Sequence, residues 1–151
     1  MKSRLSKYLS EEDIKSITAK ITEVEEHTSG EIRVSLRKSR AWSERNLSLH
    51  DLAVKEFARL GMQKTKDLTG VLMLLLMSER KFQIIADEGI NAKVESGTWE
   101  RVAEAMSLRF REGNFGKGIC DAIEAVGAEL KTYFPRKPDD RNELSNDIIE
   151  Q

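Results

Sequence analysis

Two adjacent carboxylates followed by a glycine are the residues of this chain whose types and spacing best suit cation binding. Asp87, Glu88 and Gly89 come directly after the apolar run of residues 82–86. Carboxylate oxygens are the ligands that hard cations such as Ca²⁺ take in proteins, and glycine permits a sharp turn around the ion. Polar residues also end strands and cap helices in purely structural roles. The spacing alone therefore leaves both interpretations open.

Further oxygen-bearing residues stand at other breaks in the apolar pattern. Glu31 follows Gly30, and both Asp67 and Thr69 lie just before Gly70. The chain has no D-x-[DN]-x-[DN]-G calcium loop, so a cation site would have to be assembled from several loops. The elements that carry these loops decide whether the oxygens meet.

The pattern of apolar residues predicts seven such elements. Residues 10–28 have a helical stripe, and Ser10 with Asp13 forms a capping box at its start. Residues 31–37 alternate as a half-buried strand does, and residues 48–60 repeat the helical pattern up to Gly61. The continuous run VLMLLLM at 71–77 is typical of a central strand, and residues 82–86 form a third. Two helices follow, over 99–110 and 115–130.

This order of elements predicts an α/β fold. A strand–helix–strand crossover is right-handed and makes the first two strands parallel, whereas the short turn at 78–81 makes the third antiparallel. We expect a three-layer α/β/α sandwich, with a mixed sheet that has helices on both faces. Residues 10–135 form the single domain, residues 1–9 lead into it, and the polar residues 136–151 form a flexible tail.

The predicted topology gives the sheet two chemically different edges. The starts of strands one and two and the end of strand three share one edge, which collects Glu31, Asp67, Thr69, Asp87 and Glu88. The opposite edge collects basic side chains: Arg37, Lys38, Arg40, Arg45, Arg80 and Lys81. An anion site is conceivable there, and a solvated basic rim explains the same residues.

Composition excludes several other classes of function. The 151 residues include 25 basic and 26 acidic ones, for a net charge of -1, which provides no field to attract nucleic acid. The longest apolar run, VLMLLLM, is far shorter than the about 20 residues that a spanning helix needs, and no signal peptide is visible. We expect a soluble, cytoplasmic monomer without membrane insertion. No nucleophile–histidine–acid set is visible around His27 or His50.

Several segments together resemble the TPM domain family. They are HTSGEIRV, TGVLMLLL, ERKFQIIADEGI, REGNFGKGICDAI and the closing YFP, and they span roughly residues 10–135. The resemblance implies an α/β/α sandwich and calcium binding, and some relatives are described as acid phosphatases or as modulators of membrane proteins. It implies cation binding at Asp87 and Glu88, followed by Glu31 and Thr69. Many relatives have asparagine where this chain has Thr69.

Three functional hypotheses follow. The first is a calcium-binding TPM domain with a regulatory or accessory role, with Mg²⁺ as an alternative ion. The second is a metal-assisted phosphatase, for which no catalytic residue can be named; whether the protein is an enzyme stays open. The third is a protein-interaction module that uses Arg40, Trp42 and Arg45 of the basic loop.

Overall fold

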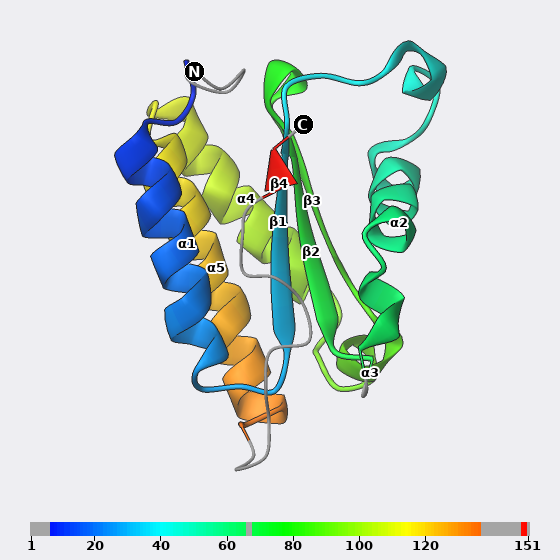
Figure 1. The fold of residues 1–151 in the computed structure, drawn as a ribbon, viewed down its shortest axis with the longest axis vertical. Coiled ribbons are helices and arrows are strands. Elements are labelled where there is room, and N and C mark those ends of the chain that lie inside the picture. Colours follow the sequence, from blue (N-terminus) through cyan, green and yellow to red (C-terminus); the bar gives the residue numbers. More distant parts are fainter. Residues whose placement is uncertain (1–6, 66–67, 137–148, 151) are drawn as a thin grey trace.

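The computed structural model describes residues 7–65, 68–136 and 149–150, and it confirms the predicted α/β/α sandwich (Figure 1). The helices are α1 (Glu11–Glu25), α2 (Leu49–Arg59), α3 (Glu88–Asn91), α4 (Thr98–Arg111) and α5 (Phe115–Tyr133). The strands are β1 (Glu31–Arg37), β2 (Gly70–Leu76), β3 (Lys81–Ala86) and β4 (Ile149–Glu150). Short 3₁₀ turns occur at η1 (Trp42–Glu44), η2 (Met62–Lys64) and η3 (Met77–Glu79).

The sheet has the strand order β3-β2-β1-β4. β1 and β2 run parallel and β3 runs antiparallel to β2, which confirms the predicted mixed sheet. Sequence analysis did not predict β4, a two-residue strand that pairs parallel with β1 at Ser35 and Leu36. The other residues of the predicted flexible tail, apart from Arg136, lie outside the described residues.

Local sequence signals explain where the helices begin and end. Ser10 and Asp13 form the predicted reciprocal capping box of α1, and the Ser48 side chain accepts a hydrogen bond from the Asp51 amide at the start of α2. Gly61 follows α2 with a φ of 71°, a left-handed conformation that glycine adopts without steric cost. α3 was not predicted, because four residues are too few to show a helical period.

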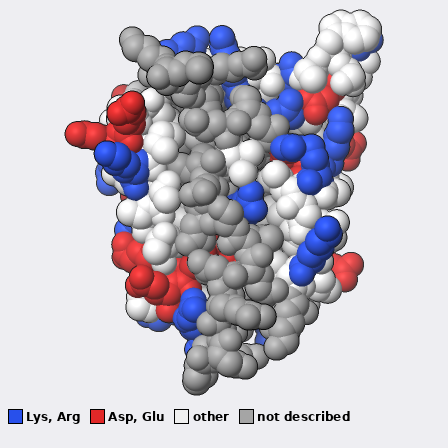
Figure 2. Space-filling model, in the orientation of Figure 1, with Lys and Arg blue, Asp and Glu red and all other residues white. Residues whose placement is uncertain are grey.

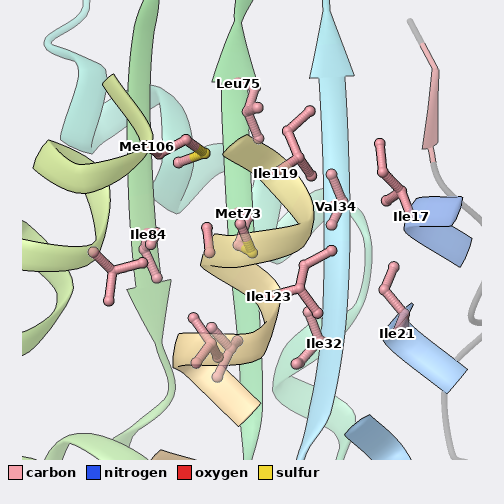
Figure 3. Close-up of a cluster of buried hydrophobic side chains, with 14 of the residues drawn as sticks. Ile17, Ile21, Ile32, Val34, Met73, Leu75, Ile84, Met106, Ile119 and Ile123 are labelled. Carbon is pink, nitrogen blue, oxygen red and sulfur yellow. The ribbon is translucent and has the colours of Figure 1, made fainter. Parts of the chain in front are cut away.

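Helices cover the two faces of the sheet unequally. α1, α4 and α5 lie on one face and α2 lies alone on the other (Figure 1). The larger core forms between α1, α4 and α5 and alternate strand residues such as Val34, Met73 and Ile84 (Figure 3). The smaller core joins Leu52 and Ala53 of α2 to Leu74 and Leu76 of β2. Every residue of β2 is buried, as expected for a central strand with both faces covered.

Candidate functional site at the acidic edge of the sheet

The start of β1, the start of β2 and the end of β3 meet at one edge, as predicted. Glu31 is the register partner of Gly70, and the Asp87 amide donates to the Gly70 carbonyl at 2.9 Å. The Gly89 amide reaches the Leu68 carbonyl at 3.1 Å. Glu31, Gly70 and Asp87 thus form one row across three strands. Asp67 lies outside the described residues.

The side chains of this row point to the α2 face. Ile32, Val71 and Ala86 pack with the larger core, and side chains alternate along a strand, so the residues one position away face the opposite side. A Cβ atom at Gly70 would lie 3.2 Å from the Met62 carbonyl oxygen, because η2 packs directly on this glycine. Gly70 therefore allows the close approach of η2 and separates the Cα atoms of Glu31 and Asp87 by about 10 Å.

Asp87 combines a structural role with an unsatisfied oxygen. Its Oδ1 accepts a hydrogen bond from the Glu88 amide at 2.8 Å and so caps α3. Its Oδ2 is buried and has no hydrogen-bond partner among the described residues. Leaving a buried acceptor unpaired costs free energy, more so when it is charged. A cation at Oδ2 would remove that cost.

Glu31 lies beside a second buried carboxyl group that sequence analysis missed. Glu25 and Glu31 are each only 2% exposed, and Glu25 Oε2 accepts a hydrogen bond from the Ile32 amide at 2.8 Å. Burial, opposed by that hydrogen bond and reinforced by Glu31, raises the pKa of Glu25 to about 8. The available signal was its position four residues after Ile21, which places Glu25 on the apolar face of α1.

The other two predicted ligands differ in exposure. Glu88 is exposed, as the first residue of α3. Thr69 is 1% exposed; its amide donates to Thr65 Oγ1 and its carbonyl accepts from the Glu31 amide, so both backbone groups of Thr69 hold the edge together. The structure therefore brings Asp87 and Glu88 together as neighbours and turns Glu31 toward Glu25.

A pocket of about 850 Å³ opens beside β3 next to Asp87. Four acidic residues line it, Asp87, Glu88, Glu95 and Glu100, whereas none of the described lysines or arginines does. Over the described ranges, no three side chains of the histidine, cysteine, aspartate or glutamate type converge tightly enough to hold a metal ion by themselves. A bound cation would therefore need water or backbone oxygens as additional ligands.

The basic edge at the other end of the strands is partly neutralised by carboxylates. Arg37 makes two hydrogen bonds to the Glu44 carboxylate, at 2.6 and 3.2 Å. Arg40 pairs with Glu79 at 2.7 Å and also donates to two backbone carbonyls of the η1 loop. Acidic side chains lie among the basic ones on this side of the molecule (Figure 2). The arrangement stabilises the loop and neutralises Arg37 and Arg40.

Two of the three residues predicted to contact a partner stay accessible in this loop. Trp42 is 77% exposed, and the guanidinium carbon of Arg45 lies 3.4 Å from the centre of its ring, a cation–π arrangement. Arg40 is held by Glu79 and is therefore a structural residue. Contact with a partner through Trp42 and Arg45 stays a prediction.

The Arg37–Glu44 pair predicts a loss of stability in acid. Hydrogen bonds from Arg37 hold the pKa of Glu44 at about 2, below its ordinary 4.5. Since the unfolded chain takes up this proton first, the pair's stabilisation is full above pH 4.5 and declines as pH falls toward 2. We expect Glu44→Gln to cost about 2 kcal/mol of unfolding free energy at neutral pH and to flatten this acid limb in urea denaturation curves.

Glu112→Gln is the matched control for that measurement. Glu112 pairs with Arg109 at 3.5 Å, but both side chains are about half exposed, so the loss should stay below about 1 kcal/mol. Equal losses in the two variants would contradict the role assigned to the Arg37–Glu44 pair.

Comparisons with known proteins agree with this architecture. The family model described as TPM domain matches residues 3–129. The solution structure of BA42 from the psychrophilic bacterium Bizionia argentinensis is 38% identical, with a TM-score of 0.85 over 95% of this chain and 96% of that one. No curated protein matches the chain significantly. None of the described helices has the length and apolar character needed to cross a bilayer.

More distant structures share the fold alone. The N-terminal domain of a P. gingivalis protein is 20% identical, with a TM-score of 0.68 over 84% of this chain and 79% of that one. The N-terminal domain of cg2496 from Corynebacterium glutamicum is 13% identical, with a TM-score of 0.63 over 93% and 84%. Because the family model covers most of the residues and the BA42 likeness extends over nearly the whole chain, the protein belongs to the TPM domain family.

Proposed function

We propose that this TPM domain binds Ca²⁺ at the acidic edge of its sheet, with Asp87 and Glu88 as the main ligands. The observation that carries the proposal is the buried Asp87 Oδ2, for which the described residues offer no hydrogen-bond partner. An adjacent carboxylate, Glu88, is exposed and can turn toward the same ion. Glu31 and Thr69 lie on the same edge and contribute less in this proposal, because Glu31 is turned toward Glu25 and the backbone groups of Thr69 are already hydrogen-bonded.

The donor set favours Ca²⁺ over Mg²⁺. Ca²⁺ accepts six to eight oxygens in irregular geometry, whereas Mg²⁺ demands a near-ideal octahedron. Two carboxylates on a turn, supplemented by water and carbonyl oxygens, suit the more tolerant ion. So few charged ligands place the expected Kd at about 0.1 to 1 mM.

A regulatory or accessory role fits this site better than phosphatase chemistry. A metal-assisted phosphatase needs the metal and the groups that hold the phosphate oxygens within one site. Here the acidic row and the Arg37–Glu44 cluster stand at opposite ends of the seven-residue strand β1, about 20 Å apart. The basic cluster is also already paired with carboxylates.

Calcium titration of the labelled protein, followed by backbone amide NMR shifts, tests the proposal. We expect saturable shifts at Asp87, Glu88 and Gly89, with smaller ones at Glu31 and Thr69, and weaker effects from magnesium. Shifts confined to other carboxylates, or the absence of saturable shifts at millimolar calcium, would reject the site.

A further inference from the structure

We propose that the groove along β3 binds a basic, extended peptide segment of a partner protein as an added β-strand. This inference goes beyond cation binding and rests on an open strand edge, apolar walls and a one-sided charge, to which the proposed calcium ligands Asp87 and Glu88 also contribute.

β3 is an edge strand with unpaired backbone groups. Its only neighbour in the described sheet is β2. The Asp87 amide bonds to Gly70, and bonded pairs alternate along an antiparallel ladder, so Ile85 and Gln83 also bond toward β2. The amides and carbonyls of Ile84 and Ala86 then point away from β2 and into the groove. Such groups are a template for an additional strand.

Within the described part of the chain, one of these outward groups already has a hydrogen-bond partner. Asn91 Nδ2 donates to the Ala86 carbonyl at 2.8 Å, and Trp99 Nε1 donates to Asn91 Oδ1 at 3.2 Å. These two hydrogen bonds occupy the Ala86 end of the β3 edge and fix the orientation of the Trp99 ring. Among the described residues, no other group bonds to the Ile84 amide, the Ile84 carbonyl or the Ala86 amide, which leaves these three groups available to an added strand.

Apolar side chains form the two walls of the groove. On the α2 side they are Val54, which is 48% exposed, and Phe57; on the α4 side they are Val94 and Trp99. A strand laid along β3 would direct alternate side chains to these two walls. Strand addition typically takes its affinity from main-chain hydrogen bonds and its specificity from such side-chain pockets.

The negative charge of the groove favours a positively charged partner. The groove is lined by Asp87, Glu88, Glu95 and Glu100 and by no lysine or arginine of the described segments, although the whole chain is nearly balanced at 25 basic and 26 acidic residues. A second copy of this chain, docked edge to edge, would bring two such acidic grooves together and be repelled. At the opposite sheet edge, β4 pairs with Ser35 and Leu36 of β1, and the Glu25 carboxylate accepts from the Ile32 amide. A cationic strand from another protein is the occupant that fits.

The probe is a capped heptapeptide of alternating lysine and valine, titrated into the labelled full chain with a chelator present. We expect saturable shifts at the amides of Ile84 and Ala86 and at the Trp99 indole N–H. The same peptide with its central valine replaced by proline should bind at least about tenfold more weakly, because proline removes a donor from the ladder. A version with glutamate in place of lysine should not bind.

Protein variants locate the binding in the groove. Glu95→Gln with Glu100→Gln should weaken binding of the lysine peptide about tenfold, whereas Glu104→Gln with Glu124→Gln, which removes two exposed charges outside the groove, should not. Neither altered pair contains a proposed calcium ligand, so this result is independent of the cation site.

Several outcomes would overturn the inference. Equal binding of the proline peptide would mean simple charge attraction without strand addition. Equal loss in the two variant pairs would place the contact outside the groove. Concentration-dependent shifts at Ile84 and Ala86 without peptide, together with a dimer in sedimentation, would assign the edge to a second copy of the chain. Absence of saturable shifts at millimolar peptide would reject it altogether.

Discussion

Asp87→Asn is expected to weaken calcium binding by at least about tenfold, or 1.4 kcal/mol, while the fold stays intact. Asparagine caps a helix about as well as aspartate, so the hydrogen bond that Asp87 Oδ1 accepts from the Glu88 amide can persist. The charge on the buried Oδ2 is what disappears. Calcium titration by calorimetry or NMR, together with a urea denaturation curve, separates lost affinity from lost stability.

Asp51→Asn is the control for this variant. Asp51 also lies in the first turn of a helix and is exposed, but that helix, α2, begins toward the end of the sheet at which β1 and β2 end (Figure 1). Its replacement should leave calcium affinity unchanged. Glu88→Gln should have an intermediate effect, because an exposed carboxylate loses less on neutralisation. Unchanged affinity in Asp87→Asn would remove the proposed site.

Glu25→Gln is expected to stabilise the protein at alkaline pH. Burial raises the pKa of Glu25 from an ordinary 4.5 to about 8, so the folded protein keeps a proton that the unfolded chain releases. The contribution of Glu25 to wild-type stability should therefore be highest below pH 4.5 and decline as pH rises to about 8. Glutamine imitates the protonated carboxyl and cannot ionise. Above pH 8 we expect the variant to be more stable by on the order of 3 kcal/mol.

Denaturant unfolding across this pH range, in calcium-free buffer, measures the effect. The adjacent Glu26 is exposed, and Glu26→Gln removes one negative charge from the same helix end without touching the buried pair. We expect that variant to retain the wild-type slope of stability against pH. If Glu25→Gln retained that slope as well, the pH dependence would have to come from another group.

The topology of the sheet could be predicted from local patterns because each pattern has a single physical solution. The alternation in residues 31–37 and the unbroken run at 71–77 separate a half-buried strand from a central one. The handedness of crossovers and the shortness of the hairpin then fix the strand directions. Glu31, Gly70 and Asp87 are thereby predicted to share one edge of the sheet, and the register confirms it.

The contacts within that row could not be predicted in the same way. Glu31 meets Glu25 because the C-terminal end of α1 lies against the open side of β1, where the Glu25 carboxylate accepts from the Ile32 amide. Helix docking of this kind depends on the packing of whole faces, which local periodicity does not specify. The same limit applies to Arg40, a candidate contact residue in the sequence that proves to be tied to Glu79.

The sequence by itself determined the α/β class, the sheet edge that collects the acidic residues and membership of the TPM family. Only the tertiary structure decided which oxygens are buried, which carboxylates are neighbours and where β3 is left open. The physical reason is the distance along the chain over which each kind of interaction acts. Propensity, capping and alternation act over a few residues, whereas desolvation and charge coupling depend on every element that packs against a group. For Asp87 and Glu25, chemical character is therefore set by neighbours distant in the chain.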